Sequence, residues 1–397
     1  MERRAVGVDL KLAAVLAGGR PEVSVRALCA ELGIHPDTYY EAKKRFDADG
    51  VTGLLPRSRR PAQSPGQTPA AMEELIVRAR KELADEGWDN GARSIRYRLV
   101  REGISAPAVS TIHRVLRRRG LIVEQPQKRP KSAMRRFEFA DRNGCWQMDG
   151  TKVKLADGTQ VVIIGAEDDH TRQGLAHKAA AGETGEAVWE CFLLAVSRYG
   201  LPAMMLTDNG MALNTDRRGR LAEFTRNLTA LGVKAISAGD YHPQTCGKRE
   251  RLNGTLKRWL ARQPMAASLA ELQAQLDVFD TVYNLRPHQS LHGATPSERA
   301  ATATVAHPHG QPTRRPPRIA TVTVDGRGGV SASRHVISVG RRYEGLTVTV
   351  IDQDGEVAVF YRNTLLRRVT IDPTRRWQPS GNQRSGRHQT RLLSERN

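Results

Sequence analysis

Three acidic residues in the middle of the chain stand where predicted strands and helices begin or end. Asp149 closes the short alternating segment 145–149, Asp208 directly follows the apolar segment 203–207, and Glu250 lies in the first turn of a helix expected to begin at residue 246 or 247. Carboxylate oxygens are the ligands that hard divalent cations prefer. The three side chains could therefore hold metal ions if the fold brings them together. Taken alone, Glu250 is better explained as an acid stabilised by the helix dipole.

The elements that would position these acids follow from the spacing of apolar residues between about 137 and 300. In the predicted last helix, Leu252, Leu256 and Leu260 recur every four residues and form an apolar stripe. The other side of that helix carries Glu250, Asn253 and Lys257. Further strands are predicted at 160–166, 174–178 and 233–237, and helices at 186–199 and 221–231.

Four motifs in this region resemble, in the same order, the catalytic core of DDE transposases and retroviral integrases. They are Gln147–Thr151, Leu206–Gly210, His242–Arg251, and the pair Tyr283–His288 with Thr295–Glu298. The last pair is similar to the segment that closes the core in bacterial insertion-sequence transposases. The resemblance implies a ribonuclease-H-like fold, in which helices flank a mixed five-stranded sheet. It places Asp149 on the first strand, Asp208 just after the fourth, and Glu250 on a following helix.

The same resemblance implies the roles of these residues. Asp149, Asp208 and Glu250 would be catalytic and would bind two Mg²⁺ ions, with Asp149 bridging both; Mn²⁺ could substitute. Two ions about 3.5–4 Å apart can activate an attacking oxygen and stabilise a leaving oxygen. Water would first cut the end of a mobile element, and the freed 3′-hydroxyl would then attack a phosphodiester of the target DNA.

The chain departs from the family pattern at a few positions. The interval from Asp208 to Glu250 is longer than usual, and the extra length falls in the polar stretch 214–220. Cys246 stands where the family has Asn, and Phe224 is the displaced aromatic expected after Asp208. No departure removes a carboxylate. We expect Asp168 and Asp169 to form a turn or to support the metal ligands.

The charge balance predicts a polyanionic partner. Lys and Arg total 62 against 42 Asp and Glu, which gives a net charge of +20, and each basic residue near a phosphate releases condensed counterions. We expect double-stranded DNA, both element ends and target, bound by a homo-oligomer. No apolar run approaches the roughly 18 residues of a membrane span, so a membrane partner is not expected.

Other signals place the protein in the cell. The start lacks the apolar core of a signal peptide, and the four cysteines are scattered without a C-x-x-C pair. We therefore expect a cytoplasmic, nucleoid-associated protein. The sequence contains no phosphate-binding G-x-x-x-x-G-K-[ST] loop. An accessory ATPase is compatible with the family but is not visible in this sequence.

Two helical parts precede the core. Residues 1–60 are predicted to hold helices at 24–32 and 36–46 around Gly33, with Ser24 and Asp37 near the helix starts as caps. This resembles a helix-turn-helix, whose second helix enters the major groove. DNA contacts are expected from Thr38, Lys43 and Lys44. A helical hairpin without a role in DNA binding explains the same pattern.

Residues 69–124 are predicted to form a second helix-turn-helix-like domain, with helices at 72–84, 94–101 and 106–119. Ile95 with Leu99, and Ile112 with Leu116, give two of these helices a core side. Beyond the first domain, basic residues cluster at the last of these helices, in the following linker and on the predicted catalytic helix. The expected DNA contacts there are Arg114, Arg117, Arg118, Lys128, Arg129, Lys131, Lys248, Arg249, Arg251 and Lys257.

The C-terminal part alternates between apolar and polar residues. Segments 319–324, 336–339, 347–351 and 357–361 predict strands of a small β-barrel of about five strands, over residues 319–372. It resembles the SH3-like domains of transposases and integrases, and either DNA binding or subunit contact would explain it. Residues 373–397 are basic and poor in apolar residues, which predicts disorder.

The sequence thus predicts a multidomain α+β protein, with a catalytic core at 137–300, that acts as a metal-dependent DNA transposase. Two alternatives remain at this point. A catalytically inactive DNA-binding regulator derived from a transposase would keep the basic modules without metal. A simple nuclease of the same fold would cut DNA without joining it to a target.

Overall fold

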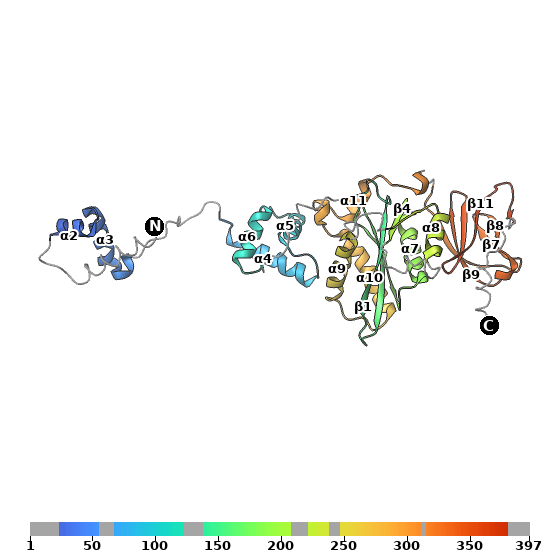
Figure 1. The fold of residues 1–397 in the computed structure, drawn as a ribbon, viewed down its shortest axis with the longest axis horizontal. Helices are drawn as coiled ribbons and strands as arrows, with labels where there is room; N and C mark the ends of the chain where they lie inside the picture. Colours follow the sequence, from blue (N-terminus) through green and yellow to red (C-terminus); the bar gives the residue numbers. More distant parts are fainter. Residues whose placement is uncertain are drawn as a thin grey trace. The chain divides into compact units, whose positions relative to one another are not determined.

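The computed structural model describes residues 24–54, 67–122, 138–207, 221–237, 247–310 and 315–379. The chain divides into two compact units, Met1–Gln67 and Thr68–Asn397. Figure 1 shows the elements of both units, with labels on the helices and on some of the strands. Within the described ranges, no helix is long and apolar enough to cross a membrane.

The first unit contains the helices α2 (Val25–Leu32) and α3 (Pro36–Asp49), followed by the 3-10 helix η1 (Gly50–Leu54). Ser24 caps α2 as predicted, because its side chain accepts a hydrogen bond from the backbone N–H of Ala27. Gly33 ends α2 with φ at 67°, the left-handed conformation that a tight turn needs.

The cap of α3 differs from the prediction. The ring nitrogen Nδ1 of His35 accepts from the backbone N–H of Asp37, so Asp37 lies inside the first turn and is not the cap. Ala42 and Leu54 form the small core, with Leu32 and Ile34 packed against them. These contacts fix the two helices around the turn at Gly33.

Three helices open the second unit: α4 (Ala70–Asp85), α5 (Ala92–Arg101) and α6 (Val109–Arg118). The predicted pairs Ile95 with Leu99 and Ile112 with Leu116 are all buried in one cluster with Ile76. Helical periodicity therefore correctly identified the core side of α5 and α6.

A mixed five-stranded sheet follows, as the resemblance implied. Its strands are β1 (Trp146–Lys154), β2 (Gln160–Asp168), β3 (Gly174–Ala180), β4 (Met204–Thr207) and β5 (Lys234–Ser237), in the spatial order β3-β2-β1-β4-β5. β1, β2 and β3 pair antiparallel, whereas β4 and β5 run parallel to β1. The first strand is thus central and has β4 beside it.

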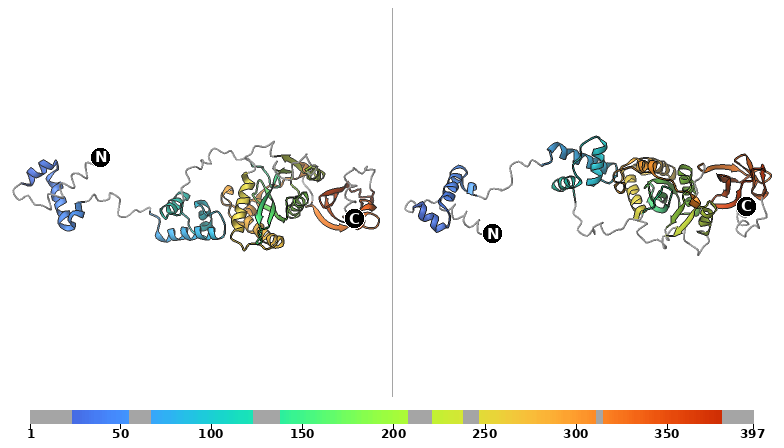
Figure 2. Two further views of the ribbon diagram at one scale, coloured as in Figure 1. Left: turned by 60° about the horizontal axis from the view of Figure 1, so that its bottom comes forward. Right: turned by 90° about the horizontal axis from the view of Figure 1, so that it is seen from above.

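Helices cover both faces of this sheet (Figures 1 and 2). α7 (Gly185–Tyr199) and α8 (Leu221–Ala230) pack on one face through Trp189, Phe192 and Phe224. α9 (Gly247–Leu260) and α10 (Leu269–Leu285) pack on the other, where Leu252, Leu256 and Leu276 meet Val161 and Ile163. The short helix α11 (Pro296–Thr302) follows, flanked by the 3-10 helices η4 (Gln289–Leu291) and η5 (Pro308–Gly310).

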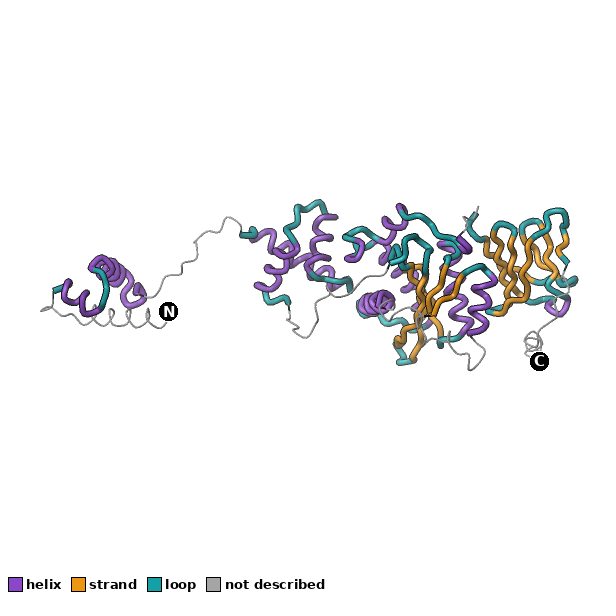
Figure 3. Tube along the Cα trace, turned by 45° about the horizontal axis from the view of Figure 1, so that its top comes forward, coloured by secondary structure: helices purple, strands orange, loops and turns teal. Residues whose placement is uncertain are grey.

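The C-terminal part consists of two sheets (Figure 3). One has the order β11-β10-β9-β6 and the other the order β12-β8-β7. The strands are β6 (Arg318–Thr323), β7 (Gly329–Ala332), β8 (His335–Ser338), β9 (Thr347–Gln353), β10 (Glu356–Tyr361), β11 (Thr364–Thr370) and β12 (Trp377–Gln378), with the 3-10 helix η6 (Arg341–Tyr343) before β9.

The strand pairing does not confirm the closed SH3-like barrel expected here. Among the described residues, β6 ends the first sheet and β7 ends the second, and no ladder joins them. The four-stranded sheet instead packs on α7 of the five-stranded sheet region, since Ile351, Ala358 and Phe360 belong to the same apolar cluster as Trp189. The ring centroids of Trp189 and Phe360 lie 4.8 Å apart.

Candidate active site

Asp149 lies in the middle of the central strand of the five-stranded sheet. β1 continues to Lys154, so the expectation that the strand ends on this carboxylate is wrong. The continuation arises because β2 pairs with β1 along its whole length, with Gly165 directly opposite Asp149. The side chain is half-buried, and its Oδ2 accepts a hydrogen bond from Asn253 Nδ2 on α9 at 2.9 Å. A rigid element therefore holds this carboxylate.

Glu250 lies one turn before Asn253 on α9. Leu252, Leu256 and Trp259 anchor the helix to the sheet, and the Glu250 side chain is exposed. Residues three apart lie on one side of a helix, so the bond from Asn253 to Asp149 brings the Glu250 side of α9 to β1. Asn253 is itself only 7% exposed. Its side chain is therefore buried against the sheet, whereas Glu250 on the same side of the helix is exposed.

Asp208 lies outside the described residues. Its neighbour in the chain, Thr207, ends β4 and pairs with Met148, the residue before Asp149. Within the described ranges, the structure contains no group of three His, Cys, Asp or Glu side chains arranged to hold a metal ion. The described part of the site thus consists of Asp149, Asn253 and Glu250.

Lys248 and Arg249 differ most from their expected positions. Both were expected to contact DNA. Arg249 is only 2% exposed, and its Nη1 lies 3.4 Å from Nε2 of the buried His177 on β3. Lys248 Nζ donates to Asp169 Oδ1 at 2.7 Å. The first turn of α9 packs directly on the sheet, and that packing turns both cations inward.

Acidic residues after β2 hold the chain around the site. Asp168 accepts hydrogen bonds from the backbone N–H groups of Asn143 and Thr171 at 2.7 Å. Asp169 accepts from Gln147 Nε2, also at 2.7 Å, in addition to Lys248. Asp168 thus forms the turn, and Asp169 links β1 to α9, in agreement with the supporting roles expected of them.

Glu167 is a buried acid that the sequence gave no reason to single out. It is 2% exposed, and burial raises the pKa of its carboxyl to about 7, although Arg172 and Arg249 lower it. It lies opposite Gln147 in the β1–β2 ladder. It directly follows the predicted apolar strand 160–166. Its place in the sequence therefore did not distinguish it from an exposed residue at a strand end.

A family model described as an integrase core domain matches residues 231–296, which contain α9, with Glu250, and all of α10. The resemblance to the superfamily of DDE transposases and retroviral integrases is therefore confirmed for this part of the chain. A second model, described as a homeodomain-like domain, matches residues 38–116.

Individual proteins resemble parts of the chain. Uncharacterized protein K02A2.6 of Caenorhabditis elegans is 28% identical over 138 residues, which cover 35% of this chain and 10% of that relative. The chain thus matches about a tenth of that relative's length.

Two solved structures give low overall scores. The HTLV-2 integrase catalytic core domain in complex with magnesium has 23% identity and a TM-score of 0.31, covering 40% of this chain and 96% of that one. The simian T-cell lymphotropic virus intasome in complex with PP2A regulatory subunit B56 gamma has 19% identity and a TM-score of 0.36, covering 70% and 95%.

The two downstream motifs of the integrase core have structural roles. Asn284 accepts from the backbone N–H of Gly174 and donates to the carbonyl of the same residue, at 2.9 and 2.8 Å, so it ties α10 to the start of β3. Thr295 and Glu298 form a capping box at the start of α11. Glu298 also pairs with Arg101 of α5 at 2.8 Å. These motifs fasten α10 to β3 and α11 to α5.

The remaining basic candidates fall into three groups. Thr38, Lys43 and Lys44 on α3 are exposed, as are Arg114, Arg117 and Arg118 on α6, although Arg118 also pairs with Glu73. Arg251 and Lys257 are exposed on α9. Lys128, Arg129 and Lys131 lie outside the described residues.

A basic groove begins next to Glu250. It has a volume of about 830 Å³, and its lining includes Arg251, Arg258 and Arg262 from the α9 side and Arg93 from α5. Asp89 is its acidic counterpart and pairs with Arg258 at 2.7 Å. One of the cations that line the groove, Arg251, is therefore the immediate chain neighbour of a proposed metal ligand.

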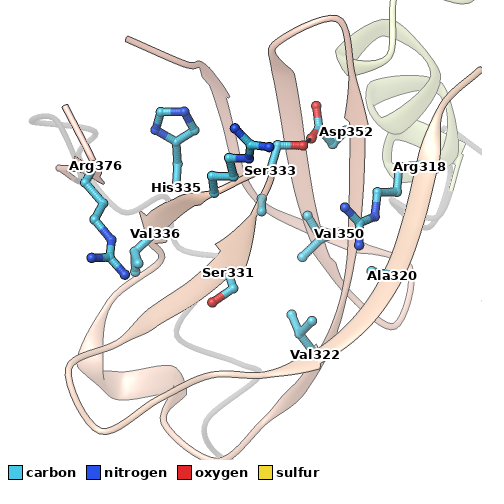
Figure 4. A pocket seen from close by; sticks show the side chains of 12 residues that line it. Arg318, Ala320, Val322, Ser331, Ser333, His335, Val336, Val350, Asp352 and Arg376 are labelled. Atoms are coloured by element: carbon cyan, nitrogen blue, oxygen red, sulfur yellow. Dashed lines mark hydrogen bonds between the residues drawn. The ribbon is translucent and has the colours of Figure 1, made fainter. Parts of the chain in front are cut away.

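A second basic cavity lies between the two C-terminal sheets. It measures about 350 Å³ and combines valine side chains with Arg318, Arg334, His335 and Arg376. Figure 4 shows Arg318 and Arg376 on opposite sides of it. Arg367, another basic residue of this part, instead donates to the backbone carbonyls of Ser338 and Gln378 and is thereby engaged inside the protein.

Proposed function

We propose that this chain is a DNA transposase of the bacterial insertion-sequence type, which cuts the ends of a mobile element and joins them to target DNA. The observation that carries the proposal is the bond from Asn253 to Asp149, which holds the Glu250 side of α9 against the central strand. The ladder between β1 and β4 adds to it, because Asp208 directly follows the residue paired with Met148. Asp149, Asp208 and Glu250 are the proposed catalytic residues.

The donor set fits divalent cations. All three proposed ligands are carboxylates, and Mg²⁺ or Mn²⁺ take oxygen ligands in preference to nitrogen or sulfur. Asp149 is only half-buried, so its carboxylate is accessible to a cation. When bound, two such ions would activate the attacking oxygen and stabilise the leaving oxygen.

The protein itself orients the reactants. β1 is paired with β2 along its whole length and with β4 up to Met148, so the Asp149 carboxylate sits on a strand held from both sides at the preceding residue. Asn253 keeps that carboxylate in one rotamer, because its amide donates to Oδ2. The exposed position of Glu250 leaves its carboxylate accessible to a phosphodiester.

Double-stranded DNA is the proposed partner. The homeodomain-like match over 38–116 supports sequence recognition by the two helical parts, here taken as 1–60 and 69–124. The groove lined by Arg93, Arg251 and Arg262 gives the phosphate backbone of the DNA a basic path that leads away from Glu250. The core, taken as 137–300, and the C-terminal sheets, taken as 319–372, complete the proposed organisation. Synapsis of two ends would require a homo-oligomer.

The test uses the full chain with labelled end DNA, a target plasmid and Mg²⁺. Wild type should nick the end and join its 3′-hydroxyl to the plasmid. Asp149→Asn and Glu250→Gln should lower both rates by about a thousand-fold, equivalent to about 4 kcal/mol of lost transition-state stabilisation. End binding, measured by fluorescence anisotropy, should remain.

Other outcomes would identify the alternatives. Cutting without joining would indicate a nuclease. Unaltered DNA binding with no cutting by wild type would indicate a DNA-binding regulator.

A further inference from the structure

The turn of α9 that carries Glu250 is attached to the sheet by two cations, the buried Arg249 and the partly buried Lys248. Across the sheet, Asp149 on β1, Gly165 on β2 and His177 on β3 lie directly opposite one another. The Arg249 guanidinium lies over the middle position, because a Cβ at Gly165 would overlap its Nη2 and approach His177 Cδ2 to 2.6 Å. Gly165 thus leaves the space that Arg249 fills, one strand away from Asp149.

His177 presents its acceptor nitrogen to Arg249. Its Nδ1 lies 2.5 Å from Asp280 Oδ1 on α10, and its Nε2 lies 3.4 Å from Arg249 Nη1. A neutral imidazole that donates from Nδ1 accepts at Nε2, and burial lowers the pKa of His177, although Asp280 raises it. Asp280 also accepts from Arg198 of α7 at 2.8 Å. The chain of contacts therefore runs from α9 through β3 to α10 and α7.

Lys248 makes a second attachment. Its Nζ shares Asp169 Oδ1 with Gln147 Nε2, and both distances are 2.7 Å. Gln147 precedes Asp149 by two positions on β1, so it lies on the same face of the strand. The bond from Asn253 to Asp149 makes a third attachment one turn further along α9. Glu250 lies between the second and third attachments.

Burial of the Arg249 side chain is costly. Within the described residues, its Nε and Nη2 and the Oε2 of Glu167 have no hydrogen-bond partner. Such groups lose their hydration without full compensation. A leucine in the apolar stripe would pack a helix onto a sheet at lower cost, so the packing of α9 does not by itself explain a guanidinium at this position.

We propose that Lys248 and Arg249 are positioning residues that fix the first turn of α9, so that Glu250 is presented beside Asp149 for cation binding. This inference rests on the proposed function. Both residues act through α9 and touch neither DNA nor the reacting atoms. Their positive charges also offset the mutual repulsion of the neighbouring carboxylates before a cation binds.

The experiment measures cation binding separately from catalysis. Mn²⁺ is titrated calorimetrically into the full chain of wild type, Arg249→Met, Lys248→Met, Arg249→Lys and Asp149→Asn, and thermal unfolding is recorded without metal. Removal of a residue that orients a metal ligand weakens metal binding by about 10–100-fold. We expect Arg249→Met and Lys248→Met to weaken Mn²⁺ binding by about ten-fold and to raise the Mn²⁺ concentration for half-maximal cleavage equally. Arg249→Lys should restore part of the affinity.

The matched control is Lys178→Met. Lys178 lies on β3, where it pairs with Glu190 of α7 at 2.9 Å, on the face of the sheet away from α9. It should bind Mn²⁺ like wild type. End-DNA affinity should be unchanged in both Lys248→Met and Arg249→Met.

Each remaining result has one meaning. Wild-type Mn²⁺ affinity in Arg249→Met and Lys248→Met, with weaker DNA binding, would overturn the positioning role and make the residues DNA contacts. If Arg249→Met does not fold, Lys248→Met and Arg249→Lys decide by the same criterion. If wild type binds Mn²⁺ no better than Asp149→Asn does, the proposed function itself fails, and this inference fails with it.

Discussion

The two faces of the central sheet are built from different chemistry. On the α7 and α8 face, Trp189 stacks on Phe192, Phe224 packs edge-on against both with ring centroids 5.9–6.1 Å apart, and Trp146 joins them from β1. On the α9 and α10 face, apolar packing around Ile163 gives way to a polar row at Asp149, Gly165 and His177. One face thus supplies most of the apolar packing. The other face replaces part of its apolar packing with polar groups that position carboxylates.

The largest effect on this comparison should come from truncating the apolar face. Phe192→Ala removes a fully buried ring that contacts Trp146, Trp189 and Phe224. Loss of such a ring costs about 3–5 kcal/mol of unfolding free energy. Chemical denaturation should show this loss, whereas the folded fraction should retain its Mn²⁺ affinity.

Glu190→Ala on the same helix is the control, because Glu190 is exposed and pairs with Lys178 at the surface. It should cost less than about 1 kcal/mol. A loss of Mn²⁺ affinity in folded Phe192→Ala would show that the two faces are not separate in function.

On the polar face, we expect a smaller effect that reduces cleavage more than it reduces stability. Asn253→Ala removes the bond to Asp149 Oδ2 at 2.9 Å but leaves the apolar stripe of α9 intact. A hydrogen bond to a charged group contributes about 1.5–3 kcal/mol, so cleavage at low Mn²⁺ should fall by about ten-fold or more. The free energy of unfolding should fall by no more than the same amount of about 1.5–3 kcal/mol, which is less than the loss expected for Phe192→Ala.

Asn253→Gln serves as the matched variant, since it keeps the amide and lengthens the side chain. A drop in stability as large as that of Phe192→Ala, with cleavage unchanged, would mean that Asn253 packs the helix and does not orient Asp149.

The same contrast explains what could be predicted from the sequence. Strands and helices of the core followed from alternation and from four-residue spacing, because burial of one face imposes those periods. The end of β1 was misplaced, since nothing local distinguishes Lys152 and Lys154 on a paired strand from the same residues in a loop. Segments such as β11, which carries Arg367 and Arg368, escaped the strand pattern for the same reason.

The polar face could be predicted only in part. Asp149 and Glu250 were found because a family motif marks them. The inward turn of Lys248 and Arg249 depends on the space above Gly165 and on acceptors supplied by Asp169 and His177, which are far away in the sequence. A run of basic residues in one segment carries no information on such pairings, and a surface position was therefore expected.

The smallest predicted effect concerns the buried acid of the polar face. Burial raises the pKa of Glu167 to about 7 from an ordinary value of 4.5, despite Arg172 and Arg249. The folded protein therefore binds this proton more tightly than the unfolded chain does. The stability that it contributes is fully present below pH 4.5 and is lost as the pH rises through about 7.

Glu167→Gln stays neutral at every pH and should remove this dependence. Relative to wild type, the variant should gain stability between pH 5 and pH 8, by a melting-temperature difference on the order of 4 °C. Thermal unfolding without metal at both pH values measures this difference. If the variant instead loses stability as the pH rises, the ionised Glu167 is held by Arg172 and Arg249 more strongly than burial disfavours it. The polar face would then be a stabilising ion network, and its contrast with the apolar face would be smaller than the contacts indicate.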